Sequence, residues 1–358
     1  MPLFSSAPNS LCILRLSAIG DVCNTVAAVQ AIQRQWPETE IVWVTGKLEA
    51  KLIEDLDNII VVVFDKKEGW AGYKSLWREL KNYRFDALLH MQYAFRASIA
   101  TLGIKAKYKL GFDATRSQDF QSLFTNVKVP SPQTMHVLDG LLAFGETLGV
   151  QDMSPKWRID YSADDLTWAT TQLDATMPNL VIVPAASKAY KNWTAEGYAK
   201  LIKHAHQTGW NIILAGSPAQ VELDLATQIE NLIDVSVSNL VGKSSLKEML
   251  ALLDKANLVV APDTGPAHMA NAVNTPIIGL YAHHNPERTG PYQYRHYVVS
   301  AYEEAIQAET GKTSKELSWR ARVKDKNAMQ RIEAQQVITM FDKVASDLNL
   351  PSSTPEVS

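Results

Sequence analysis

The sequence has little of what defines several common protein classes. Only two of its 358 residues are cysteine, Cys12 and Cys23, which excludes a disulfide framework and suits a reducing compartment. No apolar run approaches the roughly 20 residues that a membrane-spanning helix needs. The first residues also lack the basic start and small-residue cleavage site of a signal peptide. These absences predict a cytoplasmic protein.

A strong charge of one sign is missing too, since the net charge is only −3. The balance is uneven along the chain, because residues 65–116 contain eleven Lys and Arg against five Asp and Glu. This basic region is either a set of ordinary solvated helix faces or a surface for anionic glycolipids or membrane headgroups. Nowhere do basic and aromatic residues interleave as in nucleic-acid binders, so no nucleic-acid partner is expected.

Strand-like and helix-like patterns alternate along most of the chain. The hydrophobic content of 46% and the charged content of 20% are typical of globular proteins, and the length favours two domains. The predicted strands are LCILRL, IVWVT, IIVVVFD and FDALLHMQ in the first half, and NLVIVPAA, NIILAG, LVVAP and PIIGLY in the second. Several are apolar on both faces, as in buried parallel sheets. The fold class predicted is α/β, with two doubly wound parallel sheets.

The polar stretch at residues 151–165 separates the two sets of strands, which places the domain boundary near residue 155. We therefore expect a first domain at 1–155 and a second at 156–325. An irregular segment is expected at 303–327, and a C-terminal helix within 326–350. Residues 351–358 are expected to be disordered. In such sheets ligands bind where strands end and the winding reverses, so the strand-to-helix turns are the places to search.

The first such turn is SAIGD, and it carries Asp21 at the start of a helix. Asp21 is either a helix N-cap that satisfies free backbone amides or a catalytic carboxylate. Gly20 beside it permits close backbone approach. The turn has neither the G-x-G-x-x-G spacing of a dinucleotide site nor the P-loop pattern.

The most informative segment is VVAPDTGPAHMANAVNTPIIGLY, residues 259–281. Asp263, Thr264 and Gly265 follow a buried strand and open a helix that contains His268. Free amides of that first helical turn, with the Thr264 hydroxyl, are suited to a diphosphate. The alternative is that Asp263 only caps the helix, which would explain the same residues without a ligand site.

Two further turns carry polar side chains at predicted strand ends. PAASKAYKNW places Ser187, Lys188 and Lys191 in a loop suited to phosphate oxygens, although solvated loop lysines are equally ordinary. NIILAGSPAQVEL places Gly216 and, after Ser217, Glu222 near a possible ribose-binding turn, although a helix start would look alike.

Recognised metal and nucleophile motifs are missing. The sequence has no H-E-x-x-H motif and no cysteine pair, and His204 and His206 point to different faces of a helix. No G-x-S-x-G elbow supports Ser-His-Asp catalysis. We therefore expect neither a bound metal nor a cofactor.

In combination, three segments resemble the bacterial ADP-heptose:lipopolysaccharide heptosyltransferases, which are glycosyltransferases of the GT-B type. These segments are LRLSAIGDVCNTVAAVQAI, SKAYKNW and APDTGPAHMANAVNTPIIGLY with the following NPERTGPY. The resemblance covers nearly the whole chain and is greatest to the first heptosyltransferase of the pathway. It implies two Rossmann-like domains facing across a cleft, with the C-terminal helix packed back on the first domain.

The resemblance also implies roles for single residues. Asp21 matches the proposed general base of an inverting, metal-independent transfer. The donor-binding positions that it implies, together with those suggested by the turns above, are Ser187, Lys188, Lys191, Gly216, Glu222, Asp263, Thr264, Gly265 and His268. The match is incomplete at two places. Glu222 is slightly displaced from the position after the G-x-P turn where related enzymes often carry an acidic residue for the adenosine ribose. His283, His284 and Asn285 stand where many relatives have Gly-Pro-Thr.

By the same resemblance the partners are a nucleotide-sugar donor, an anionic Kdo-lipid A acceptor and, transiently, the cytoplasmic face of the bacterial inner membrane. Arg96, Lys107 and Arg116 are the expected acceptor-binding cations. Two other functions remain open from the sequence. One is another nucleotide-sugar enzyme of this shape, a different glycosyltransferase or an epimerase, and the other is a non-catalytic sugar-nucleotide-binding module.

Overall fold

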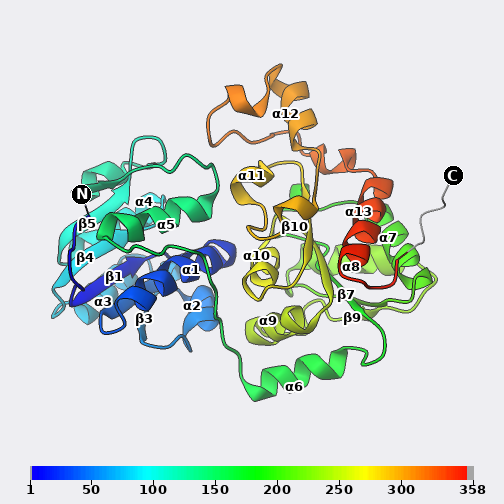
Figure 1. Ribbon diagram of the computed structural model, residues 1–358, viewed down its shortest axis with the longest axis horizontal. Coiled ribbons are helices and arrows are strands. Elements are labelled where there is room, and N and C mark those ends of the chain that lie inside the picture. Colours follow the sequence, from blue (N-terminus) through cyan, green and yellow to red (C-terminus); the bar gives the residue numbers. More distant parts are fainter. Residues whose placement is uncertain (1, 353–358) are drawn as a thin grey trace. The chain divides into compact units, whose positions relative to one another are not determined.

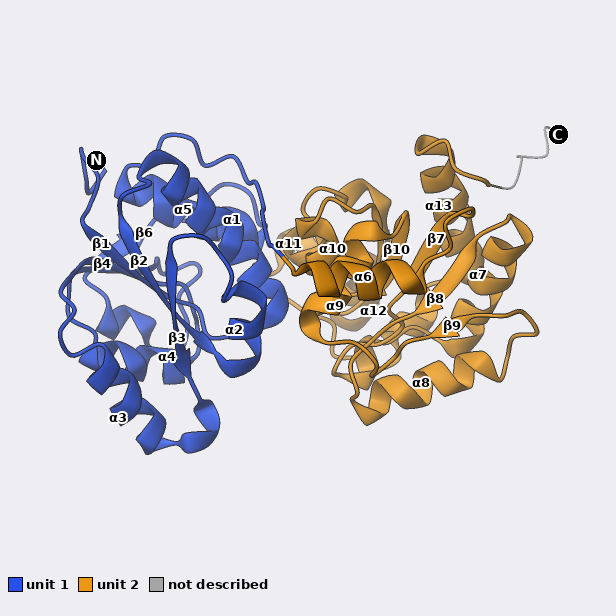
Figure 2. Cartoon of the chain, turned by 90° about the horizontal axis from the view of Figure 1, so that it is seen from below, with its two compact units in different colours: residues 1–160 blue, residues 161–358 orange. Residues whose placement is uncertain are grey.

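The computed structural model describes residues 2–352, and the chain divides into two compact units, residues 1–160 and 161–358 (Figures 1 and 2). Each unit contains one six-stranded parallel sheet. Eight of the strands lie where the apolar runs predict them. The fold therefore has the two parallel α/β sheets that the sequence indicates.

Unit 1 has the strand order β3-β2-β1-β4-β5-β6. Its strands are β1 (Ser10–Leu14), β2 (Glu40–Gly46), β3 (Ile59–Phe64), β4 (Phe85–His90), β5 (Ala106–Phe112) and β6 (Val127–Val129). Its α-helices are α1 (Ile19–Gln35), α2 (Lys47–Ile53), α3 (Trp70–Glu79), α4 (Phe95–Ala100) and α5 (Val137–Leu148), and short 3₁₀ turns span Lys66–Glu68, Thr101–Gly103 and Gln121–Phe124. The winding reverses between β1 and β4.

Apolar side chains on both faces of this sheet are buried beneath helices. Cys12 and Leu14 of β1 join Val42 and Val44 of β2 in a core that α3 and α4 cover. On the other face, α1 packs beside α5. The burial of both faces explains why these strands read as nearly continuous apolar runs.

Unit 2 has the strand order β12-β11-β10-β7-β8-β9. Its strands are β7 (Asn179–Ile182), β8 (Asn211–Leu214), β9 (Ser238–Asn239), β10 (Leu258–Pro262), β11 (Ile277–Tyr281) and β12 (Val298–Ser300). Its α-helices are α6 (Ala163–Gln172), α7 (Ala195–Gln207), α8 (Gln220–Glu230), α9 (Leu246–Lys255), α10 (Gly265–Ala272), α11 (Pro286–Thr289), α12 (Tyr302–Thr310) and α13 (Ala334–Asp347). The 3₁₀ turns are Ala189–Lys191, Arg295–Tyr297, Ser314–Glu316 and Ala328–Arg331. Here the winding reverses between β7 and β10.

The connection between the units differs from the expected division near residue 155. Residues 154–158 remain part of unit 1 because they are hydrogen-bonded along α1. Arg34 Nη2 donates to the Ser154 carbonyl at 2.7 Å, and Trp157 Nε1 donates to the Cys23 carbonyl at 2.9 Å. Gln30 exchanges two hydrogen bonds with the backbone of Arg158.

The structure corrects the expected packing of the C-terminal helix. The apolar face of α13 is buried in the core of unit 2, not on the first domain, since Val337, Phe341 and Val344 are fully buried there. His204 Nε2 of α7 lies 2.8 Å from Asp342 Oδ1 and holds the same helix in place. Trp210 Nε1 donates to the Pro351 carbonyl at 2.7 Å, which fixes the chain just beyond α13.

Two other terminal expectations are affected. The stretch 303–327, expected to be irregular, contains most of α12. Of the tail expected to be disordered, residues 353–358 lie outside the described residues.

Candidate functional site

In unit 1, Asp21 lies at the carboxyl edge of the sheet, where the winding reverses. It occupies the third position of α1, and its Oδ2 accepts a hydrogen bond from the Ala18 amide at 3.3 Å. Ala18 is the N-cap, so the N-cap alternative for Asp21 is wrong; Asp21 is instead the N3 residue of a capping box and accepts from the N-cap amide. The same oxygen forms an ion pair with Arg15 Nη2; the Arg15 side chain is 5% exposed and that of Asp21 is 40% exposed. Asp21 is thus a charged acceptor that solvent reaches from one side.

Arg15 is a site residue of unit 1 that the sequence analysis missed. It directly follows β1, and its Nη1 also donates to the Met91 carbonyl after β4. Gln92, the next residue, accepts from the Leu16 amide at 3.0 Å and the Ser17 amide at 3.3 Å through Oε1. The available signal was positional, since both Arg15 and Gln92 follow strands that a doubly wound sheet makes neighbours.

Two buried titratable groups surround Arg15. His90 at the end of β4 is buried, and this burial, with the nearby charges of Arg15 and Lys109, lowers the pKa of its imidazole to about 3. Glu49 of α2 is nearly buried, and burial raises the pKa of its carboxyl despite the opposing Lys66 and Arg15 charges. The imidazole beside Arg15 is therefore neutral, and the Arg15 guanidinium forms its ion pair with the Asp21 carboxylate.

The three expected acceptor-binding cations are not brought together. Arg96 is exposed on α4, at the same edge of the sheet as Asp21. Lys107 is exposed at the start of β5, at the opposite, amino edge. The prediction for Arg116 is corrected, because its guanidinium is buried and donates to the carbonyls of Thr134 at 2.7 Å and His136 at 3.2 Å. It is a structural residue within unit 1.

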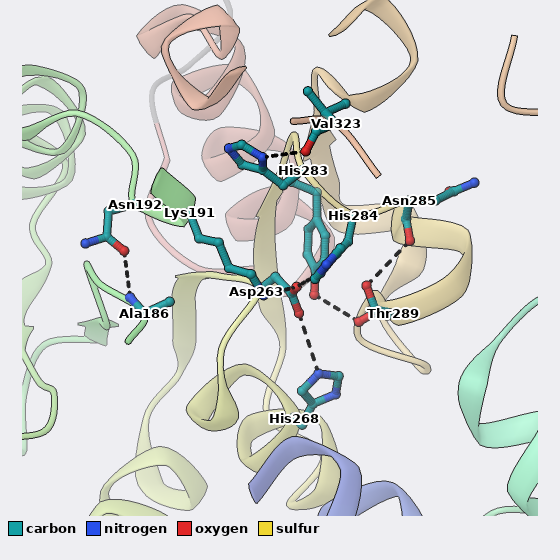
Figure 3. Close-up of polar contacts among 11 residues, drawn as sticks. Ala186, Lys191, Asn192, Asp263, His268, His283, His284, Asn285, Thr289 and Val323 are labelled. Atoms are coloured by element: carbon teal, nitrogen blue, oxygen red, sulfur yellow. Dashed lines mark hydrogen bonds and ion pairs between the residues drawn. The ribbon is translucent and has the colours of Figure 1, made fainter. Parts of the chain in front are cut away.

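In unit 2, three cationic or imidazole side chains converge on Asp263 at the end of β10 (Figure 3). Lys191 Nζ lies 2.8 Å and His284 Nδ1 2.5 Å from Asp263 Oδ2, while His268 Nε2 lies 4.0 Å from Oδ1. Burial opposes ionisation of Asp263, but the His284 hydrogen bond and the charges of Lys191 and both histidines prevail. The pKa of the Asp263 carboxyl is therefore held below its usual value.

The strand order explains this convergence. Lys191 follows β7, Asp263 follows β10 and His284 follows β11, and these three strands are neighbours in the sheet. Lys191 and Asp263 therefore lie where the winding reverses, which is the ligand-binding position of doubly wound sheets. Asp263 does not cap α10, whose N-cap is Thr264, and the Thr264 side chain makes no capping hydrogen bond. As at any helix start, the amides of Gly265 and the first turn have no intrahelical acceptor. A lysine beside such a helix start suits a diphosphate.

The neighbouring loops hold the remaining predicted residues. Ser187 and Lys188 are exposed ahead of the 3₁₀ turn at 189–191. Glu222 is buried on α8, and both of its oxygens accept from Ser217, from the amide at 2.7 Å and from the hydroxyl at 2.5 Å. Burial raises the pKa of Glu222 against these hydrogen bonds. A Cβ at Gly216 would lie 2.7 Å from Glu222 Oε2, so a side chain there would displace this carboxylate from its present position.

Residues 2–352 contain no group of three or more His, Cys, Asp and Glu side chains arranged to hold a metal ion. In that same range no helix is long and apolar enough to span a bilayer.

Known proteins resemble the chain over most of its length. The profile of Glycosyltransferase family 9 (heptosyltransferase) matches residues 73–320. The chain is 50% identical over 344 residues to the lipopolysaccharide core heptosyltransferase OpsX of Haemophilus influenzae, covering 96% of this chain and 99% of that protein. It is 24% identical to lipopolysaccharide heptosyltransferase 1 of Escherichia coli K12, covering 82% of this chain and 94% of that protein.

Solved structures share the fold. A family 9 glycosyltransferase from Veillonella parvula superposes with a TM-score of 0.76 at 22% identity, covering 97% of this chain and 98% of that chain. E. coli heptosyltransferase WaaC with ADP superposes with a TM-score of 0.71 at 21% identity, covering 94% of this chain and all of that chain. The two sheets are thus those of the GT-B heptosyltransferase structures. The chain belongs to glycosyltransferase family 9, the heptosyltransferases, and is an enzyme of that family.

Proposed function

We propose that this enzyme transfers L-glycero-D-manno-heptose from its ADP derivative to the inner core, Kdo-lipid A, of lipopolysaccharide, with inversion and without a metal ion. The observation that carries the proposal is the cluster of Lys191, His284 and His268 around Asp263, beside the start of α10. The name of the 50% identical relative supports the lipopolysaccharide core as the acceptor.

Unit 2 supplies the donor site in this proposal. Lys191 and the amides of Gly265 and the first turn of α10 bind the diphosphate and stabilise the charge that develops on it as the bond to the sugar breaks. Ser187, Lys188, Thr264 and His268 complete the phosphate and sugar contacts. In this proposal the buried Glu222, at the Gly216 turn after β8, binds the ribose and exchanges its Ser217 contacts for the ligand's hydroxyls.

Unit 1 supplies the base. The Asp21 carboxylate takes the proton of the acceptor hydroxyl while that oxygen bonds to the anomeric carbon, and the bond from this carbon to the ADP oxygen breaks. Attack opposite the leaving group inverts the anomeric centre. Arg15 orients the carboxylate through the ion pair, and the exposed side of Asp21 is the side open to the acceptor.

A peripheral membrane contact also belongs to this proposal. Trp70 at the start of α3 and Phe95 at the start of α4 are exposed, and the exposed cations Lys66, Lys67 and Arg96 lie close to them in the sequence. Exposed aromatic rings flanked by basic side chains suit an anionic lipid surface. In this proposal the lipid-linked acceptor binds at the same edge of the sheet as Asp21, on the cytoplasmic face of the inner membrane.

The test is transfer by the purified protein from ADP-heptose to Kdo-lipid A, followed by mass spectrometry and anomeric NMR. We expect a product one heptose heavier with inverted configuration, at a rate that EDTA does not lower. Conversion of the donor without acceptor would identify an epimerase instead. Donor binding without any turnover would identify a binding module, and loss of activity in EDTA would refute the metal-independent mechanism.

A further inference from the structure

The contact between His284 and Asp263 adds a second donor to an oxygen that already has one. Lys191 Nζ and His284 Nδ1 both reach Asp263 Oδ2, at 2.8 and 2.5 Å. The three side chains are only 18%, 21% and 16% exposed for Lys191, His284 and Asp263 respectively, so solvent screens them poorly. Lys191 alone would balance the charge of Asp263, which leaves the role of His284 to be explained.

We propose that His284 is a positioning residue that replaces Lys191 on Asp263 when Lys191 moves to the donor diphosphate, and that its imidazole takes up a proton from solvent in this exchange. The inference rests on the proposed function, because it requires the diphosphate to bind Lys191. In the free enzyme Lys191 neutralises Asp263, so the second donor to this carboxylate need not carry a charge.

The charge balance gives the reason. Once Lys191 bonds to phosphate oxygens, Asp263 loses its cationic partner, and an unpaired buried carboxylate is strongly disfavoured. An imidazolium at His284 restores the pair through the same Nδ1–H, and the approaching diphosphate charge favours it further. Histidine is the side chain that takes up a proton most readily near neutral pH. The exchange thus releases Lys191 to the donor while keeping Asp263 in place.

The groups around His284 are consistent with this assignment. From the elements packed against it they are Asp263 after β10, Lys191 of the 189–191 turn, His268 of α10, Tyr281 of β11, the adjacent His283, and Arg322, whose backbone forms a bridge with that of His284. Asp263 is the one acid of this group. His283 bonds instead to the Val323 carbonyl, at 3.1 Å from Nδ1, and does not reach Asp263 in the structure (Figure 3).

The experiment measures protons taken up per donor bound. The probe is ADP-2-deoxy-2-fluoro heptose, a donor analogue present in an E. coli WaaC structure, whose doubly esterified diphosphate does not titrate near neutral pH. Calorimetric titrations in two buffers of different ionisation enthalpy give the proton count. The variant His284→Asn retains an N–H donor for Asp263 but cannot take up the proton, and His206→Asn on the exposed face of α7 is the matched control.

We expect the wild type and His206→Asn to take up a substantial fraction of a proton near pH 7.5, and His284→Asn to take up almost none. The affinity of the wild type should fall by up to about tenfold per pH unit above neutrality, and that of His284→Asn should stay level. Equal proton uptake by wild type and His284→Asn would overturn the inference. Failure of the wild type to bind the analogue would instead refute the proposed donor site.

A second measurement needs no variant to fold. Histidine-ring NMR of the wild-type enzyme, with and without the analogue, should show one imidazole near Asp263 becoming imidazolium on binding. Unchanged protonation of every histidine on binding would refute the exchange, even if the analogue binds tightly.

Discussion

Replacing Asp21 by asparagine is the sharpest test of the catalytic assignment, because the amide keeps the shape of the carboxylate and loses its basicity. The Asn Oδ1 can still accept from the Ala18 amide and from Arg15, the two partners of Asp21 Oδ2 in the structure. The substitution therefore removes the proton acceptor and leaves most of the local geometry.

Two magnitudes follow. Loss of a positioned general base lowers a rate by about 10²- to 10⁴-fold, so kcat should fall by that factor. The stability cost should be only about 1–2 kcal/mol, since the Asp21 side chain is 40% exposed and the buried Arg15 keeps its bond to the Met91 carbonyl. Donor affinity should not change, because every proposed diphosphate contact lies in unit 2.

The assay is ADP release at saturating donor and acceptor, paired with calorimetric affinity for the fluorinated donor analogue and with urea unfolding. Asp86→Asn is the control, because Asp86 caps the Asn9 and Ser10 amides at the opposite edge of the same sheet. It should retain wild-type kcat. A kcat for Asp21→Asn within threefold of wild type, with the protein folded, would refute Asp21 as the base and leave it as a helix-start residue.

The other predictions concern unit 2 and the corrected Arg116. Lys191→Met should raise the donor KM by about 10- to 150-fold, the equivalent of losing about 1.5–3 kcal/mol of charge-assisted contact, whereas the exposed Lys200→Met should not; equal KM values would contradict the diphosphate role. Because the pKa of Asp263 lies below its usual 3.8, its ionised form stabilises the fold above about pH 4 and that contribution is lost as the pH falls. The free energy of unfolding, measured in urea, should therefore fall more steeply in acid for wild type than for Asp263→Asn. Parallel curves for the two proteins would contradict this stabilising role of the ionised Asp263. Phe341→Ala should lower the free energy of unfolding by about 3–5 kcal/mol, since its ring is fully buried against Trp210, and a loss below 1 kcal/mol would show that α13 is not part of the core. Arg116→Met should cost about 2 kcal/mol by orphaning two carbonyls without changing the acceptor KM; a raised KM in a fully stable protein would restore its predicted role.

The strands that the sequence missed share a physical feature. Ala106–Phe112 alternates lysine with apolar residues, and Val127–Val129, Ser238–Asn239 and Val298–Ser300 are two or three residues long. All four lie towards the outer edges of their sheets, where one side is less covered and the apolar signal is weak. Seven of the eight predicted strands lie inside their sheets, where burial of both faces leaves a continuous apolar run. The eighth, β3, is an edge strand that was found because its sequence is apolar even though Ile60 and Val63 are exposed.

The sequence by itself determined the α/β class, the positions of the central strands and the turns after them where Asp21, Lys191 and Asp263 lie. These are local properties, since a buried strand and a helix start each leave a pattern within a few residues. Only the tertiary structure decided which turns meet. Because β1 and β4 are neighbours in the first sheet, Arg15 and Gln92 lie close together at the ends of these strands. Because β7, β10 and β11 are neighbours in the second sheet, His284 and Lys191 meet at Asp263. It also buried Arg116 and placed α13 in unit 2, because strand order and helix docking depend on side chains far apart in the chain.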